Sequence, residues 1–332
     1  MQEIVRLITQ HGLALVFANV LLAALTVSRG LVVSACSFVV LTGCGLAPRY
    51  VHEDHPLAGR AWDVRAERFV GRDEIIAQAA TARVVLLGEV HDNALQHDLQ
   101  RDFFERIAAV GPPRSAVFEQ FDLEQQPAID AARAARGSAR HVVEAGGMAS
   151  GWNRTFYEPL VAAALSAGWP VRAGNLSRAE LQPVMRKGFS SLPPGLFERL
   201  AIGRAWNAER DAAMKKLLVE SHCGSVPDAL AEGLARAQRL RDATLADVLL
   251  AQPGAVVGVM GNGHAQRDIG VPAYVASREP AATLLSVGLL EVAPGKQKPH
   301  DYALLGAAHE PLYDFVWFTP RAVRKDPCKA GK

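Results

Sequence analysis

The chain has 332 residues, of which 49% are hydrophobic and 21% charged, so it can bury a sizeable core and is neither disordered nor a charged coiled coil. Its 36 basic and 34 acidic residues give a net charge of +2, so no nucleic acid is expected as a partner. Four cysteines are too few for a small scaffold held together by disulfides.

The first 43 residues differ from the rest of the chain. Two apolar runs, 13–25 and 31–41, are each shorter than the roughly 20 apolar residues that span a bilayer. The second run has the basic flank and small-residue end of a secretory signal, and it finishes in Leu41-Thr42-Gly43-Cys44, which resembles the bacterial lipobox. We therefore predict a signal peptide over residues 1–43 and lipid attachment, including palmitate, at Cys44. The alternative is that Cys44 is an ordinary small residue of a transmembrane segment.

A signal of this length is unusual, and initiation at Val27 would give a compact one with Arg29 as its basic region. Residues 44–65 are rich in Pro, His, Gly and charge, which predicts a linker. Residues 66–328 are then expected to form a single domain.

Short apolar runs predict strands, and apolar residues at helical spacing predict helices. This pattern predicts an α/β fold with a mostly parallel central sheet flanked by helices. The helical stretch 195–251 is either an insertion or an added helical layer. In chain order we expect strands over 83–87, 115–118, 170–173, 255–260, 283–290 and 314–318, with helices over 94–110, 123–136, 155–167, from Ser177, and over about 195–220 and 227–251.

Polar side chains follow each of the first four predicted strands. Because ligands of an open parallel sheet bind outside the carboxyl ends of its strands, these side chains predict a shared crevice. Its Glu and His residues could transfer protons or hold a metal, whereas the alternative is a buried network that pins the loops. The expected crevice residues are Glu89, His91 and Asn93 after the first strand, Glu119 after the second, Asn175 after the third, and Asn262 and His264 after the fourth.

The sequence lacks the motifs of several other kinds of active or binding site. The chain has no Gly-x-Ser-x-Gly elbow and no phosphate-binding loop. Gly261-x-Gly263 is not followed by the third glycine of a dinucleotide site, so no nucleotide cofactor is expected. His97 falls on the helix after the first strand, and we expect it to face solvent.

The sequence Leu87-Gly88-Glu89-Val90-His91-Asp92-Asn93, with His97 and Gln100, resembles the opening motif of the ChaN-like family. These are iron-regulated bacterial lipoproteins associated with haem binding and uptake, within the Tiki and erythromycin-esterase-like superfamily. Paired histidines are frequent in the family where this chain has Gln96-His97. The resemblance covers residues 80–328 and includes the stretches 118–121 (FEQF), 152–160 (WNRTFYEPL), 174–178 (GNLSR), 237–243 (AQRLRDA, with Arg241 and Asp242), 261–264 (GNGH) and 313–320 (YDFVWFTP).

The resemblance implies a lipid-anchored protein of the cell envelope, in the outer membrane and facing the periplasm or the cell surface. It also implies haem binding through a tyrosine, a homodimer, and haem-uptake components as partners. Tyr157 is the preferred ligand of the haem iron and Tyr274 the second, because a phenolate suits Fe(III). Trp152 could cover the porphyrin face and Arg154 could meet a propionate. The alternative for each tyrosine is a core residue with a satisfied hydroxyl.

Two functions stay open. The first is a haem-binding lipoprotein without catalysis. The second is a hydrolase, esterase or metal-dependent protease, in which Glu89 is the general base, while His91 and His264 polarise the substrate or hold a metal.

The positions of the four cysteines predict different roles for them. Cys36 would be removed with the signal and Cys44 would carry the lipid. Cys223 and Cys328 then remain in an oxidising compartment, which predicts a disulfide between them. The alternative is two buried free thiols.

Overall fold

The structure is a computed structural model that describes residues 50–148, 151–224, 226–306, 309–325 and 328. Within these residues the centre is an eight-stranded sheet with the order β3-β2-β9-β8-β4-β7-β5-β6. Neighbouring strands from β9 to β6 run parallel, while β2 pairs antiparallel with β3 and β9. The strands of this sheet are β2 (Ala61–Asp63), β3 (Arg68–Val70), β4 (Val84–Leu87), β5 (Arg114–Asp122), β6 (Val171–Asn175), β7 (Ala255–Val259), β8 (Leu284–Glu291) and β9 (Phe315–Thr319).

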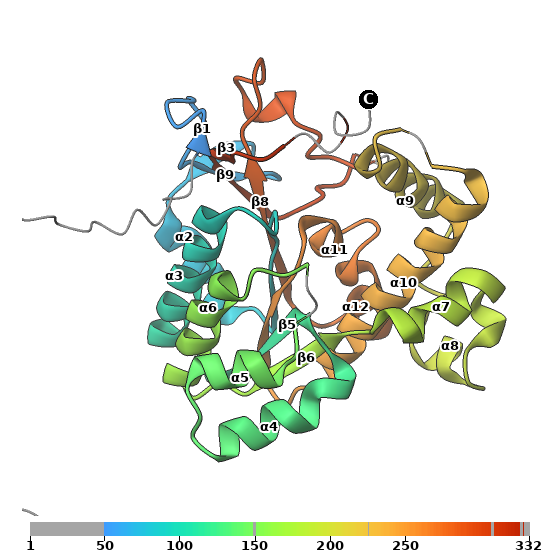
Figure 1. The fold of residues 1–332 in the computed structure, drawn as a ribbon. Helices are drawn as coiled ribbons and strands as arrows, with labels where there is room; N and C mark the ends of the chain where they lie inside the picture. The colour runs from blue at the N-terminus through green and yellow to red at the C-terminus, as the bar shows by residue number, and fades with distance from the viewer. Residues whose placement is uncertain (1–49, 149–150, 225, 307–308, 326–327, 329–332) are drawn as a thin grey trace, which may run out of the picture. The chain divides into compact units, whose positions relative to one another are not determined.

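The helices form two layers, one on each face of the sheet. Figure 1 shows α2, α3 and α6 on one side of the strands, with α10 and α12 on the other. The α/β class and the mostly parallel sheet predicted from the sequence are thereby confirmed. The helices are α2 (Arg72–Thr81), α3 (Ala94–Val110), α4 (Gln126–Ala134), α5 (Ala139–Ala145), α6 (Arg154–Ser166), α7 (Arg178–Lys187), α8 (Leu196–Arg199), α9 (Ala208–Ser221), α10 (Asp228–Leu250), α11 (Asn262–Ala265) and α12 (Val271–Arg278).

Strand β4 shows why the central strands are continuously apolar. All four of its side chains are buried, and successive side chains of a strand point to opposite faces of the sheet. Val85 and Leu87 belong to the core that includes Phe104 of α3. Val84 and Leu86 belong to the second core, under α10. Because helices cover both faces, neither face of β4 can be polar.

The helical stretch 195–251 is a layer of the fold. Leu245 and Leu249 of α10 lie in the same core as Val256 of β7, so α10 itself covers one face of the sheet. Helix α9 packs outside it, where Met214 and Ala235 share a smaller cluster. Of the two alternatives expected from the sequence, the structure agrees with an added helical layer and not with an insertion.

The prediction of a linker over residues 44–65 is wrong for residues 50–65, which contain two strands. Tyr50–Val51 form β1, which pairs with β10 (Arg321–Ala322), and β2 is an inner strand of the main sheet that carries the buried Trp62. Strands of two or three residues are too short to show an alternating pattern among the Pro, His and Gly around them. Residues 44–49, like the predicted signal peptide and Cys44, lie outside the described residues.

Cys223, just past α9, and Cys328, near the end of the chain, form a disulfide, as predicted. The bond ties the C-terminal tail to the end of the outer helix α9. No helix in the described part of the chain is long and apolar enough to cross a membrane.

Arg114, the first residue of β5, joins the sheet to α2. It is 3% exposed, and its guanidinium donates hydrogen bonds to the carbonyl oxygens of Ala79, Ala80 and Ala82 at 2.6, 2.9 and 3.0 Å. The last carbonyls of a helix have no partner within the helix, so Arg114 satisfies the end of α2. Burial lowers the pKa of Arg114 to about 10, which keeps the guanidinium charged at neutral pH.

Arg114→Met should lower the free energy of unfolding by about 2–3 kcal/mol, because buried carbonyls would lose a charged donor. Urea unfolding followed by circular dichroism measures this change. Arg140→Met is the matched control and should change stability little, since Arg140 is an exposed arginine of α5 whose one ion pair among the described residues is with Glu144, one turn away. Equal losses in the two variants would contradict the role given to Arg114.

Candidate functional site

The Glu89 carboxylate is the centre of a buried hydrogen-bond network at the carboxyl end of β4. Its side chain is 0% exposed, and donors reach it from α3, β5, α6 and its own loop. Burial alone would raise the pKa of Glu89, but the charges of His97 and His91 and the donated hydrogen bonds hold that pKa below its usual value. The donors are Tyr157 Oη at 2.6 Å, His91 Nδ1 at 2.8 Å, Gln100 Nε2 at 3.0 Å and Gln120 Nε2 at 3.2 Å.

His91 is the member of this network that reaches solvent. Its side chain is 45% exposed, and its Nδ1 donates to the Glu89 carboxylate. Nε2 has no hydrogen-bond partner among the described residues, and the Trp152 ring stands edge-to-face with its centroid 4.5 Å from that of the imidazole. Burial lowers the pKa of His91, but the hydrogen bond to Glu89 and the charge of Glu119 outweigh it and raise that pKa overall.

Gly261 lets His91 pack over the chain that follows β7. A Cβ at this position would lie 2.8 Å from His91 Cε1, closer than carbon atoms approach. The Gly261 N–H donates to Glu119 Oε2 at 2.7 Å, which draws β5 and the loop after β7 together. Glycine is therefore required here by a close approach of a side chain.

Glu119, His264 and Asp242 form a second buried group. His264 Nε2 lies 3.2 Å from Glu119 Oε1, and His264 Nδ1 lies 2.5 Å from Asp242 Oδ1 on α10. Burial alone would lower the pKa of His264, but the two carboxylates raise it to about 10, so the ring is an imidazolium at neutral pH. Burial alone would raise the pKa of Glu119, but the charge and hydrogen bond of His264, together with the charge of His91 and the Gly261 N–H, lower that pKa to about 2.

The structure thus brings Glu89, His91, Glu119 and His264 together, as the strand ends predicted. The register between β5 and β6 shifts between Phe118 and Asp122, and Glu119, whose side chain belongs to the cluster, lies within this irregular stretch. The other predicted crevice residues have local roles, and Arg241 is half-buried on α10 next to Asp242. Asn93 donates to Glu291 and to the Pro320 carbonyl, Asn262 exchanges two hydrogen bonds with the Leu289 backbone, and Asn175 accepts from the Leu176 N–H.

The geometry does not fit either tyrosine that the sequence favoured as an iron ligand. Tyr157 and Tyr274 are both 0% exposed. The Tyr157 hydroxyl donates to Glu89, and burial together with that carboxylate raises the pKa of Tyr157 far above its usual value, which disfavours a phenolate. Tyr274 lies in the core against Trp206, and burial raises its pKa as well. The sequence around Tyr157 is aromatic, and that pattern cannot distinguish a core face from a binding face.

The expectation that His97 faces solvent is wrong. His97 is 3% exposed, stacks on Phe156 with ring centroids 5.0 Å apart, and places its Nδ1 3.5 Å from Glu89 Oε2. The buried face of α3 begins with polar residues, Gln96, His97 and Gln100, which surround the loop after β4. Apolar spacing cannot reveal such a face, and in the sequence Gln100 was marked only by its place in the family motif.

Within the described residues, no three His, Cys, Asp or Glu side chains are placed to hold a metal ion together. The cluster is instead a network of paired acids and imidazoles, from which one imidazole reaches the surface. Such an arrangement can orient a single neutral nitrogen toward an external ligand.

The raised pKa of His264 makes stability depend on pH in the alkaline range. A histidine whose folded pKa lies above its unfolded value stabilises the fold fully below about pH 6.5, and this stabilisation is lost as the pH rises toward 10. The free energy of unfolding should fall on the order of 4 kcal/mol across this range, and His264→Gln should remove most of that dependence. Urea unfolding at a series of pH values tests this, and parallel curves for the two proteins would contradict it.

Comparison with known proteins places these features in a family. The family described as haem-binding uptake, Tiki superfamily, ChaN, matches residues 75–275, a stretch from α2 to α12 that contains the whole cluster. A search of curated proteins finds no match.

One solved structure supports the fold, and weaker matches are found as well. ChaN of Campylobacter jejuni, described as binding haem cofacially, aligns with a TM-score of 0.63 at 19% identity, over 77% of this chain and 95% of its own. The type III effector HopBA1 aligns with a TM-score of 0.39 at 14% identity, over 83% and 97% of the two chains. An effector domain of a Vibrio vulnificus toxin gives 0.38 at 14% identity, over 64% and 35%. Because the family match covers more than half of the sequence, the chain belongs to the ChaN haem-binding uptake family of the Tiki superfamily.

Proposed function

We propose that this protein binds haem and takes part in haem or iron uptake at the cell envelope. Family membership supports haem binding, as does the cofacial haem binding described for ChaN of Campylobacter jejuni. The observation that carries the proposal is the half-exposed His91, whose Nδ1 is held by the buried Glu89 while its Nε2 has no partner among the described residues.

We infer that His91, rather than a tyrosine, would ligate the haem iron. Histidines that bind metals usually donate their other ring N–H to a carboxylate, which fixes the tautomer and raises the basicity of the ligating nitrogen. Glu89 has this relation to His91. Bound haem would supply an iron centre, for which imidazole is a common axial ligand. Tyr157 serves this ligand indirectly, because its hydroxyl helps hold the Glu89 carboxylate in place.

Trp152 and Arg154 complete the proposed haem site. Trp152 is half-buried beside His91, so its ring could cover part of a porphyrin face. Arg154 is exposed in the first turn of α6, two residues further along, where its guanidinium could pair with a propionate. Both residues keep the roles expected from the sequence, with His91 in place of the tyrosine.

Titrating the purified full chain with haemin should produce a saturable change in the Soret band. His91→Ala should weaken binding at least about tenfold, whereas Tyr157→Phe should retain most of it, because the buried phenol is not the ligand. Affinity should also fall as the pH drops through the raised pKa of His91, since the imidazolium cannot ligate iron.

His141→Ala is the matched control, because His141 is an exposed histidine on α5 and its loss should leave the Soret titration unchanged. Near-ultraviolet circular dichroism shows whether each variant is folded. Full binding by His91→Ala, together with lost binding by a folded Tyr157→Phe, would reject the histidine and restore the tyrosine as ligand.

The alternative function, a hydrolase, is not favoured by the geometry around Glu89. The Glu89 carboxylate is fully covered, and its oxygens already accept hydrogen bonds from four side chains, which leaves no room for a substrate water. A metal-dependent mechanism would need a ligand set that the described residues do not form.

We further propose that lipid on Cys44 anchors the protein in the outer membrane after removal of residues 1–43. The lipobox-like tetrapeptide supports this, and Cys44 itself lies outside the described residues. A homodimer as the haem-bound form, and haem-uptake components of the envelope as partners, are proposed from the family resemblance.

Mass spectrometry of the protein from a detergent phase should find an N-terminal peptide that begins at Cys44 and carries diacylglycerol and an amide-linked acyl chain. Cys44→Ser should accumulate as a longer precursor without lipid. Recovery of residues 1–6 in the mature wild-type protein would contradict the cleavage.

A further inference from the structure

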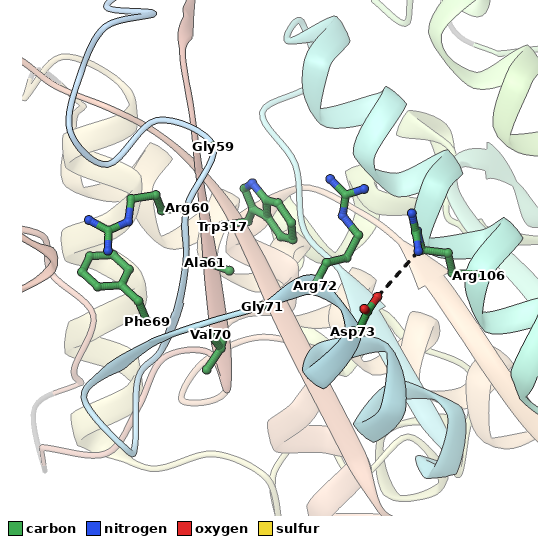
Figure 2. Close-up of a pocket in the computed structure, with 10 residues that line it drawn as sticks. All are labelled: Gly59, Arg60, Ala61, Phe69, Val70, Gly71, Arg72, Asp73, Arg106 and Trp317. Carbon is green, nitrogen blue, oxygen red and sulfur yellow. Dashed lines mark ion pairs between the residues drawn. The ribbon is translucent and has the colours of Figure 1, made fainter.

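The C-terminal tail, which follows β9 from Pro320 onward, starts from a fixed point. Strand β9 is an inner strand of the main sheet, between β2 and β8. Its Trp317 is 6% exposed, and Figure 2 shows this ring next to Arg72, whose guanidinium carbon lies 5.1 Å from the ring centroid. From there the chain forms β10, which pairs with β1. The first residues of the tail are therefore held in place against the sheet.

Arg324 joins this tail to the loop that carries His91. Its Nε and Nη2 each lie 2.6 Å from a carboxylate oxygen of Asp92, the residue that follows His91 in the chain. Its Nη1 and Nη2 each lie 2.6 Å from a carboxylate oxygen of Glu291, at the end of β8. One guanidinium thus holds two carboxylates in bidentate pairs, a geometry that the planar arginine side chain supplies and a lysine ammonium does not.

Glu291 extends this contact to the next residue of the loop. Its Oε1 accepts a hydrogen bond from Asn93 Nδ2 at 2.8 Å. The Glu291 side chain is 11% exposed, so its charge is poorly screened by water. Among the described residues, Arg324 is the one cation paired with either Glu291 or Asp92. Without it the two carboxylates would repel each other, and the loop would be pushed away from the end of β8.

The Cys223–Cys328 disulfide ties the far end of the tail to the fold. Cys328 follows Arg324 by four residues, and Cys223 lies just past α9, 105 residues earlier than Cys328 in the chain. The end of a chain is poorly ordered unless it is tied down. The disulfide therefore keeps Arg324 between two attachment points, with β10 before it and the end of α9 after it.

We propose that Arg324 is a positioning residue for His91 and that the disulfide maintains it in this role. This inference rests on the proposed function, in which His91 Nε2 ligates the haem iron. Glu89 holds the imidazole from inside the fold, whereas Arg324 holds the adjoining backbone from the tail through Asp92. Holding the loop from both sides limits the orientations of the ring, which reduces the ordering cost when haem binds.

Nuclear magnetic resonance of the haem-free full chain, labelled with ¹⁵N-histidine, tests the positioning directly. Arg324→Met should shift the ring-nitrogen signals of His91 toward those of an unconstrained histidine, because the loop would relax and weaken the hydrogen bond to Glu89. The signals of His264, which belongs to the second buried group, should stay unchanged. A loss of stability alone would not move the signals of the folded protein.

Haemin titration measures the consequence for binding. Arg324→Met should weaken haemin binding about fivefold, since the loop must be ordered again at that moment. Arg324→Lys should recover part of this loss, because an ammonium keeps the charge but not the two bidentate pairs. Combining Cys223→Ser with Cys328→Ser should weaken binding about twofold and shift the His91 signals in the same direction, since β10 still holds the start of the tail.

Arg321→Met is the matched control, because it removes an arginine of the same tail that forms no ion pair among the described residues. It should change neither the His91 signals nor the haemin affinity. The role of Arg324 is rejected if its Met variant leaves the His91 signals or the haemin affinity as in the wild type, or if Arg321→Met has an equal effect. Unchanged His91 signals in the double serine variant reject the role of the disulfide. A wild-type protein that binds no haemin rejects the proposed function, while the His91 signals still decide the role of Arg324.

Discussion

The burial of one carboxylate constrains the whole site. Placing the Glu89 charge at 0% exposure is costly unless hydrogen bonds replace the water it loses. The chain meets this cost with donors from three separate elements, Gln100 on α3, Gln120 on β5 and Tyr157 on α6. Removing any one donor would leave part of a buried charge unpaired. The network therefore ties a helix layer to the carboxyl ends of two strands.

This constraint also determines which group meets solvent. Of the side chains around Glu89, Tyr157 and His97 are buried, and His91 is the one that is half-exposed. Its orientation follows from the hydrogen bond to Glu89 on one side and from the absence of a side chain at Gly261 on the other. The second group, around His264, holds the loop that contains Gly261. The buried charges thus position one imidazole nitrogen, and the protein's own groups satisfy the rest.

The sequence predicted the features that depend on local pattern. The strand over 255–260 and the helix over 94–110 are found within a residue of the expected bounds, and Ser177 caps α7 with a capping box. The disulfide was predicted because Cys223 and Cys328 are the two cysteines that remain in an oxidising compartment after Cys36 and Cys44 are assigned to the signal and the lipid. The Glu and His residues at the strand ends meet because parallel strands deliver their carboxyl ends to one edge.

What the sequence could not show depends on partners far along the chain. Whether Tyr157 faces a ligand or the core is decided by Glu89, 68 residues earlier. The buried position of His97 depends on the same carboxylate, and a polar helix face gives no apolar signal. Strand β2 is joined to the main sheet by its pairing with β9, near the end of the chain.

We propose that Glu89 holds His91 so that its Nε2 can ligate haem iron. Resonance Raman spectroscopy of the reduced haem complex, prepared with ¹⁵N-labelled histidine, tests it most directly. Ligation by His91 predicts an iron–nitrogen stretching band that shifts to lower frequency with the label and that is lost in His91→Ala. A spectrum that is insensitive to the histidine label, or one that shows tyrosinate bands, would contradict it.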